Sequence, residues 1–235
     1  MRAIAISGFK NSGKTTLTAL LAAALENLGR RVAVIKRVHH ALDLPRSDTG
    51  KLRAADRAVA ALGDNEAAIF WSGKVGFMDI FTRLSADIVL VEGGKSLAFL
   101  PRVLCLHHER EAPDLAPNLA VATYGAVALP PLPAFDQNSL TELARLVDEK
   151  AFLLGGLDCG LCGRKNCAGL TGDIVRGAAA PEDCPALTPP SFSLKVNGRE
   201  VPLNDFTARI LEGALRGMLA PLKGMAAGRV EIVLK

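Results

Sequence analysis

Long apolar runs, aromatic side chains and charge of one sign are all scarce in this sequence, and each scarcity excludes a class of protein. No apolar stretch approaches the roughly 18 residues that a membrane-spanning helix requires. Aromatic residues make up 5% of the chain, and no basic tract is interleaved with them, which argues against nucleic-acid binding. The formal net charge of +4 is mild, and no internal repeat is present. We therefore expect a protein with no membrane span and no nucleic-acid partner.

The hydrophobic content, in contrast, is sufficient for a folded core. Of the 235 residues, 49% are hydrophobic and 22% are charged, as in globular proteins of one large or two modest domains. The N-terminus already forms an apolar run and a glycine-containing loop, so we expect no signal peptide and a cytoplasmic location. Thiols stay reduced there, so the five cysteines are expected to act as ligands more than as disulfides.

A phosphate-binding loop follows the first apolar run. Residues 8–15 are GFKNSGKT, which has the spacing G-x-x-x-x-G-K-[ST], and they come directly after residues 3–6. Backbone N–H groups of such a loop surround a β-phosphate, and the next helix points its positive dipole end at it. The pattern and its setting make a chance match a weak alternative. The predicted nucleotide contacts are Gly8, Asn11, Ser12, Gly13, Lys14, Thr15 and Thr16.

Short apolar strands alternate with helical segments along residues 1–150, which predicts a parallel sheet with crossover helices. The expected fold is α/β, the layered sheet of a P-loop NTPase with helices on both faces, and its ligand site should lie at the carboxyl ends of the strands. Further strands are predicted at residues 31–36, 67–71, 87–91, 102–106 and 118–123, and helices at 52–62, 79–84 and 140–148.

Two changes in composition predict two further domains after a nucleotide-binding domain at residues 1–150. Residues 151–190 form a small Cys-rich metal module. Residues 191–235 form a C-terminal α+β element in which a hairpin turns at Asn197-Gly198, a helix follows Asn204, and residues 230–234 form a closing strand.

Glu92 ends an apolar strand and is followed by Gly93 and Gly94, which is the Walker B position of a phosphate-loop protein. It would hold Mg²⁺ through water or orient the attacking water, while Lys14 would reach the β- and γ-phosphates and Thr15 would bind Mg²⁺. An ordinary acid at a strand end is the alternative. Lys14 and Glu92 are the predicted catalytic residues.

Other polar residues follow the second strand: Lys36, His39, His40, Asp48 and Arg53. The adjacent histidines could bind a metal or carry protons. Contact with a phosphate or a partner is favoured, because no cysteine or third histidine is placed nearby.

Four cysteines, Cys159, Cys162, Cys167 and Cys184, have the spacing C-x2-C-x4-C-x16-C. Their segment has too few large apolar residues to fold unaided, so a metal centre should hold it. Zinc and an iron–sulfur cluster both accept four thiolates. Two features favour an iron–sulfur cluster. One is the four-residue gap, and the other is the amides of Gly160 and Gly163, which are expected to be free to bond cluster sulfides. The fifth cysteine, Cys105, lies on a strand and is expected in the core.

The cysteine segment resembles the small four-iron four-sulfur (4Fe-4S) domain of electron-transport subunits and corrinoid iron–sulfur proteins. This resemblance rests on the spacing of the first three cysteines, on Gly177 after Ile174-Val175, and on Cys184-Pro185.

Residues 1–125 resemble the MobB family of GTP-binding adaptors in molybdopterin guanine dinucleotide synthesis. The motifs that carry this resemblance are the phosphate loop, Val34 to Lys36 with His39-His40, Asp48-Thr49 with Arg53, and Val89 to Gly93 with Lys95. The resemblance implies GTP and Mg²⁺ binding, weak GTPase activity, a guanylyltransferase partner, a homodimer, and a role with molybdenum or tungsten cofactors, with molybdopterin itself a possible ligand.

Three departures from the family pattern stand out. Gly94 replaces an aromatic residue, Tyr124 replaces an expected acid, and no N-K-x-D segment is present, so GTP over ATP rests on the resemblance alone. A rival hypothesis is a nucleotide-gated electron-transfer or metallocluster-delivery protein. A small-molecule kinase is a third, but the sequence displays neither a substrate base nor an arginine-rich lid.

Overall fold

A computed structural model describes residues 1–38, 41–43, 46–53, 57–71, 73, 75–187, 192–196, 199–201, 203 and 205–222. The chain divides into two compact units, residues 1–184 and residues 185–235. The first unit therefore contains both the predicted nucleotide-binding domain and all five cysteines. The division into three domains at residues 150 and 190 stays a prediction.

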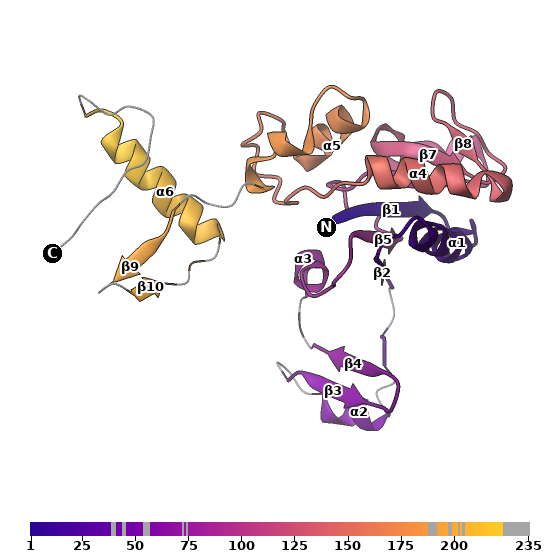
Figure 1. Ribbon diagram of the computed structural model, residues 1–235, viewed down its shortest axis with the longest axis horizontal. Helices are drawn as coiled ribbons and strands as arrows, with labels where there is room; N and C mark the ends of the chain where they lie inside the picture. The colour runs from indigo at the N-terminus through magenta and orange to yellow at the C-terminus, as the bar shows by residue number, and fades with distance from the viewer. Residues whose placement is uncertain are drawn as a thin grey trace. The chain divides into compact units, whose positions relative to one another are not determined.

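The first unit is built on a six-stranded parallel sheet in the order β2-β5-β1-β6-β7-β8 (Figure 1). Because β1 lies in the middle, the loop that follows it emerges between the carboxyl ends of β5 and β6. The α/β fold predicted from the alternating strands and helices is confirmed. The strands are β1 (Arg2–Gly8), β2 (Val32–Lys36), β5 (Ile88–Glu92), β6 (Arg102–Cys105), β7 (Ala120–Tyr124) and β8 (Ala134–Phe135).

Alternate residues of β1 face two different cores, as the two-residue period of a strand requires. Ile4 and Ile6 pack in the core that also contains residues of α1 (Lys14–Asn27) and α4 (Leu140–Lys150). These two helices lie side by side (Figure 1). On the other face, Ala3 and Ala5 share a core with residues of the short helix α3 (Phe77–Phe81).

One predicted element is wrong. The alanine-rich residues 52–62 were expected to form a helix. In the structure the short helix α2 (Asp48–Leu52) ends where that segment begins, and β3 (Val59–Leu62) pairs antiparallel with β4 (Ala67–Phe70). Alanine has the highest intrinsic helix propensity, but propensity is a weak determinant over a short segment, and pairing with a second strand overrides it.

Two arginine side chains stack on aromatic rings at the end of this hairpin. The guanidinium of Arg53 lies 5.4 Å from the centre of the Phe70 ring, and that of Arg83, just after α3, lies 4.9 Å from the centre of the Trp71 ring. Both contacts have cation–π geometry. They connect the hairpin to the segments before and after it in the chain.

Asp148, near the end of α4, ties three elements together. Its carboxylate accepts hydrogen bonds from Arg2 at 2.6 Å and from Arg30 at 3.0 and 2.8 Å. Arg2 also donates to the Asp148 carbonyl. The hydrogen bond from Arg30 is the main reason why the pKa of Asp148 lies below its ordinary value. The start of β1, the turn after α1 and the end of α4 are thereby joined.

The 3₁₀ helices of the first unit are η1 (Glu109–Leu115), η2 (Pro117–Leu119), η3 (Gln137–Ser139) and η4 (Pro181–Asp183), and α5 (Cys167–Val175) is its last α-helix. The second unit contains η5 (Pro185–Leu187), the hairpin of β9 (Leu194–Val196) and β10 (Arg199–Val201), and α6 (Asp205–Leu219).

In the second unit, Arg209 of α6 donates to the carbonyl of Pro185 at 2.6 Å. The predicted turn at Asn197-Gly198, the cap at Asn204 and the strand at 230–234 lie outside the described residues. Among the residues that are described, no helix is both long and apolar enough to cross a bilayer.

Candidate functional site

The loop between β1 and α1 has the backbone conformation of a phosphate cradle. Asn11 and Gly13 both have positive φ values, of 64° and 82°. A Cβ atom at Gly8 would lie 2.3 Å from both the Cys105 carbonyl oxygen and the Ser12 hydroxyl, which leaves no room for any side chain. Glycine at position 8 is therefore required for the loop to pack on the end of β6.

The polar groups of this loop fit a bound phosphate. Gly13 provides α1 with no side-chain cap, so the first N–H groups of this helix lack the usual acceptor. The Ser12 hydroxyl is buried without a hydrogen-bond partner. The Lys14 ammonium donates to the Phe9 carbonyl, within the loop itself. Uncapped amides, an unpaired hydroxyl and a lysine at a helix start are the features that an anion site at a helix N-terminus requires.

Beside the loop, three predicted residues meet. The Thr15 hydroxyl donates to Glu92 Oε1 at 2.6 Å, and the Lys36 ammonium lies 3.1 Å from the same carboxylate oxygen. Lys36 also lies 3.5 Å from the Thr15 hydroxyl. Glu92 is only 8% exposed. The structure thus brings together the hydroxyl and carboxylate predicted to bind Mg²⁺, with a lysine ammonium beside both.

The loop after Glu92 approaches the phosphate loop from the side. The Lys95 ammonium lies 3.4 Å from the centre of the Phe9 ring, and Arg37 donates to the Ser96 hydroxyl at 2.5 Å. Gly94 has a φ of +75°, and a Cβ atom there would lie 3.1 Å from Leu97 and 3.4 Å from Val91. This backbone explains why the aromatic residue expected at position 94 is missing here.

Of the other predicted candidates that follow β2, two are described, and both make their contacts elsewhere. His39 and His40 lie outside the described residues. Asp48 pairs with Lys51 at 3.1 Å, and Arg53 lies over Phe70, so the contacts of both belong to the α2–hairpin segment. Among the described candidates of this group, Lys36, the last residue of β2, is the one that contacts Glu92.

Residues on β6 and β7 form the buried wall beyond the phosphate loop. Cys105 is fully buried, and burial raises the pKa of its thiol to about 12, as befits a core residue. Burial also raises the pKa of Tyr124, whose hydroxyl is buried without a hydrogen-bond partner. The position where an acid was expected therefore carries a protonated phenol.

Arg102, at the start of β6, is a buried residue that sequence reasoning missed. It is 0% exposed and donates to the carbonyls of Leu115 at 3.0 Å and Leu97 at 3.2 Å. It also reaches the Lys95 carbonyl at 3.4 Å. Burial lowers its pKa to about 10, so it is charged at neutral pH. Arg102 therefore anchors the loop that carries Lys95. In the sequence, the only sign of this role was an arginine at the start of an apolar strand.

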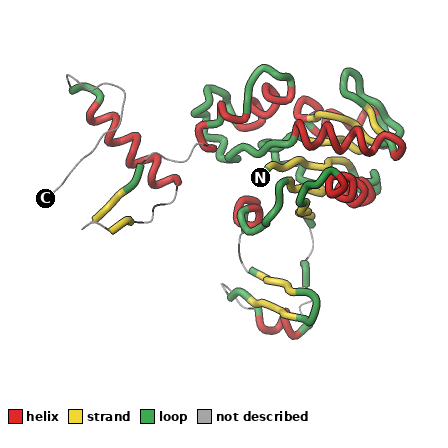
Figure 2. Tube along the Cα trace, viewed as in Figure 1, coloured by secondary structure: helices red, strands yellow, loops and turns green. Residues whose placement is uncertain are grey.

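The four clustered cysteines all lie around α5, which Figure 2 shows as a short helix flanked by loops. Cys167 begins the helix, where the Asn166 side chain accepts from the Gly169 amide at 3.0 Å. Cys167 and Cys184 are buried, Cys162 is half-buried and Cys159 is exposed, and all four are free thiols. Between residues 155 and 187, Leu170 is the one buried large apolar residue, so the predicted shortage of core is confirmed.

The cysteines do not form a closed metal cage in the structure. Across the described residues, no three His, Cys, Asp or Glu side chains are grouped as a metal site. The Gly163 amide donates to the Gly160 carbonyl at 2.9 Å, so the expectation that this amide is free for a cluster sulfide is wrong. Burial raises the pKa of Cys167, and the nearby Cys184 adds to the rise. The donor chemistry, four free thiols in a segment without a core, still fits a metal centre.

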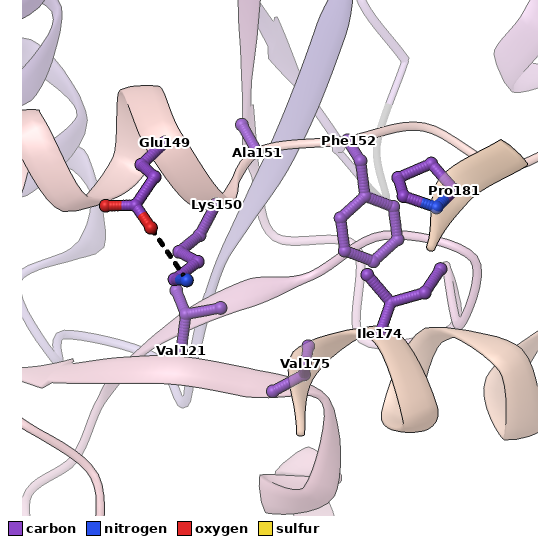
Figure 3. Close-up of a pocket in the computed structure, with 8 residues that line it drawn as sticks. All are labelled: Val121, Glu149, Lys150, Ala151, Phe152, Ile174, Val175 and Pro181. Atoms are coloured by element: carbon purple, nitrogen blue, oxygen red, sulfur yellow. Dashed lines mark ion pairs between the residues drawn. The ribbon is translucent and has the colours of Figure 1, made fainter. Parts of the chain in front are cut away.

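A pocket lies where α5 meets the sheet domain, away from the phosphate loop. Figure 3 shows the Phe152 ring facing Ile174 and Pro181, with the Glu149–Lys150 ion pair of 2.8 Å at one side. Val121 of β7 and Val175 of α5 also line it. The cysteine segment thus packs on the sheet domain through α5.

Two protein-family profiles match this sequence. The family described as "Molybdopterin guanine dinucleotide synthesis protein B", or MobB, matches residues 3–127, which is more than half of the chain. A second family, described as "Putative Fe-S cluster", matches residues 154–186 and so includes all four clustered cysteines.

Curated relatives and solved structures agree with the first match. A "Putative molybdopterin-guanine dinucleotide biosynthesis adapter protein" of Methanocaldococcus jannaschii is 26% identical, over 96% of this chain and 93% of that protein. The corresponding adapter protein of Haemophilus influenzae is 32% identical, over 51% of this chain and 73% of that protein. The crystal structure of Bacillus subtilis MobB is similar in fold, with a TM-score of 0.50 and 20% identity over 66% of this chain and 99% of that one.

Proposed function

This chain belongs to the MobB family, and from that premise we propose that it is an adapter in molybdopterin-guanine dinucleotide biosynthesis that binds a nucleoside triphosphate at its phosphate loop. The observation that carries the proposal is the Thr15–Glu92–Lys36 cluster, with its 2.6 and 3.1 Å contacts, beside the uncapped start of α1. The names of both curated relatives support the pathway.

Each residue of the cluster has a role in this proposal. Lys14 leaves the Phe9 carbonyl to contact the β- and γ-phosphates, while Gly13 offers its amide and Ser12 its buried, unpaired hydroxyl to the same groups. Thr15 and Glu92 would hold Mg²⁺, which supplies charge neutralisation at the phosphates. Lys36 then adds positive charge near the γ-phosphate. Hydrolysis should be slow, because Arg37 is bound to Ser96 and Arg53 lies over Phe70.

The base is proposed to be guanine on the strength of the family. No N-K-x-D segment occurs in the sequence, so no base-reading motif of that kind supports the choice. Isothermal titration with GTP and with ATP, each in Mg²⁺, tests it. Absence of GTP binding would contradict the proposed function.

Replacing Lys14 by alanine should remove most of the affinity for a triphosphate. The motif assigns the Lys14 ammonium, and no other cation of the loop, to the phosphates. Lys10→Ala is the matched control, since Lys10 is an exposed lysine of the same loop at a position that the motif leaves open. Titration calorimetry should show loss of binding for Lys14→Ala and near-normal binding for Lys10→Ala. Equal affinity of both variants would refute the loop assignment.

We further propose that the four cysteines hold an iron–sulfur cluster of the 4Fe-4S type. The family match over residues 154–186 supports a cluster, and the four free thiols supply its ligands. Such a cluster would offer one-electron chemistry or hold the segment together. Anaerobic purification with visible absorption and iron and sulfide assays tests this. A colourless protein that contains zinc would contradict it.

A second candidate function is nucleotide-gated electron transfer or metallocluster delivery. It is favoured by one observation, that the phosphate loop and all four clustered cysteines belong to the same compact unit. A cluster midpoint potential that changes when nucleotide binds would support this function. A midpoint potential that is the same with and without nucleotide would contradict nucleotide gating, and the adapter role would then be the one remaining proposal.

The proposed partner is the guanylyltransferase of the pathway, with molybdopterin as a further possible ligand, and the cofactor metal is molybdenum or tungsten. Co-purification of that enzyme tests the partnership.

A homodimer is also proposed. The β3–β4 hairpin exposes Leu62 by 89% and Ile69 by 55%, and a lone two-stranded hairpin is marginally stable in water. Sedimentation over a range of concentrations tests the dimer.

A further inference from the structure

Asp158 has an unusual backbone directly before the first clustered cysteine. Its φ is +48°, in the left-handed region that few residues other than glycine adopt. Aspartate and asparagine tolerate this region better than most side chains. Such a backbone costs free energy unless surrounding contacts hold it, so its contacts are informative.

Two reciprocal hydrogen bonds join Asp158 to Cys167, nine residues later in the chain. The Asp158 carboxylate accepts from the Cys167 amide at 2.7 Å, and the Asp158 amide donates to Cys167 Sγ at 3.4 Å. Within the described residues, this is the one hydrogen bond made to a cysteine sulfur. It closes the loop that carries Cys159 and Cys162.

The other polar contacts of the segment have different targets. Arg164 pairs with Asp173 at 3.0 Å and donates to the Cys162 carbonyl at 2.9 Å. Asn166 caps α5 by accepting from the Gly169 amide. In the part of the chain that the structure describes, neither side chain forms a hydrogen bond with Cys167 Sγ. Asp158 therefore acts on this sulfur in a way that the neighbouring anchors do not.

We propose that Asp158 is a positioning residue of the metal centre formed by the four cysteines: its carboxylate fixes the Cys167 amide, and its own amide donates to Cys167 Sγ. This rests on the proposed function in one respect, that these cysteines bind metal. A hydrogen bond to a metal-bound thiolate stabilises its negative charge. It therefore retains the metal and, in an iron–sulfur cluster, shifts the reduction potential upward.

The test uses the full chain, reconstituted anaerobically with iron and sulfide, in three variants. Asp158→Ala removes the carboxylate and the tolerance for the left-handed backbone. Asp158→Asn keeps that tolerance and an oxygen acceptor for the Cys167 amide. Asn166→Ala is the matched control, because it removes a cap of the same helix without touching either bond of Asp158.

Two quantities are measured: the rate at which a chromophoric chelator removes the metal, and the midpoint potential by anaerobic redox titration. Asp158→Ala should lose metal at least several-fold faster than the wild type. Its potential should be lower than that of Asp158→Asn, because both variants lose the negative charge beside Cys167 and only Asp158→Ala loses the contacts that hold the donating amide at Cys167 Sγ. Asp158→Asn should retain metal as the wild type does, and Asn166→Ala should leave the potential unchanged. A merely structural role would make Asn166→Ala and Asp158→Ala alike.

The outcomes separate the two proposals. Wild-type protein that holds zinc in place of a cluster contradicts the iron–sulfur proposal, while the chelator rates still test Asp158. Wild-type protein that holds no metal after reconstitution overturns both. A bound cluster with the same release rate and potential in Asp158→Ala overturns the role of Asp158 alone.

Discussion

Gly94 shows how one backbone angle decides which residue the nucleotide site accepts. With φ at +75° and Leu97 3.1 Å from the place of a Cβ atom, an aromatic residue at this position needs both a strained backbone and repacking. The family pattern has an aromatic there, whereas this chain has two glycines in succession. The loop after Glu92 has therefore adopted a shape that glycine alone fits well.

Replacing Gly94 by phenylalanine should lower the free energy of unfolding by about 2–4 kcal/mol, from left-handed strain and overpacking together. Gly94→Ala is the control and should cost less, because it adds only the Cβ atom that meets Leu97 and Val91. Urea unfolding followed by circular dichroism measures both. A Gly94→Phe protein as stable as wild type would show that the loop adopts another backbone.

At this scale the sequence predicts motif residues well and unpatterned residues poorly. Lys14, Thr15 and Glu92 could be assigned from spacing alone, and the structure places Thr15 and Glu92 2.6 Å apart. Arg102 and Asp158 could not be found, because their roles depend on carbonyls and a sulfur that only folding brings near. The loop positions of Lys95 and Phe9 likewise meet only in three dimensions.

At the scale of elements, the alternation of short apolar strands with helical segments was enough to predict the parallel sheet. The failure at residues 52–62 has a physical reason: the helix propensity of alanine was outweighed by pairing of β3 with β4, whose residues follow later in the chain. The join made by Asp148 was also invisible in the sequence, because its arginine partners are 146 and 118 residues away.

Asp148→Asn should destabilise the first unit by about 1 kcal/mol at neutral pH, since the ion pairs are partly exposed. The hydrogen bond from Arg30 holds the pKa of Asp148 below its ordinary value. The carboxylate therefore adds stability above the ordinary aspartate pKa of about 4, and that stability is lost as pH falls through the lowered value.

Urea unfolding at pH 7 and near pH 2 tests this sign. The difference between Asp148→Asn and wild type should be present at pH 7 and shrink at the lower pH. Asp114→Asn, at an exposed aspartate, is the matched control and should change stability little at either pH. A difference that grows with acidification would contradict the argument.

At the scale of the whole molecule, the three clusters of buried residues found among the described residues belong to the first compact unit. With the residues packed against them, they extend no further than Val175. Nucleotide binding and the cysteine centre are both proposed for this unit. The described residues of the second unit contribute to none of these three clusters.

A chain of residues 1–184 should therefore fold by itself and bind a triphosphate about as tightly as the full chain does. Circular dichroism melting and isothermal titration measure the two properties. Lys14→Ala in the shortened chain is the control and should fold but not bind. A shortened chain that aggregates or loses its affinity would show that residues 185–235 support the site.

Trp71 can serve as an intrinsic fluorescence probe. It is the single tryptophan of the chain, it comes directly after β4, and the guanidinium of Arg83 lies 4.9 Å from its centre. Indole emission from the unlabelled protein therefore comes from one place, between the hairpin and α3. Any ligand or second copy of the chain that disturbs this contact will change the wavelength or intensity of the tryptophan emission, so binding can be followed without a label.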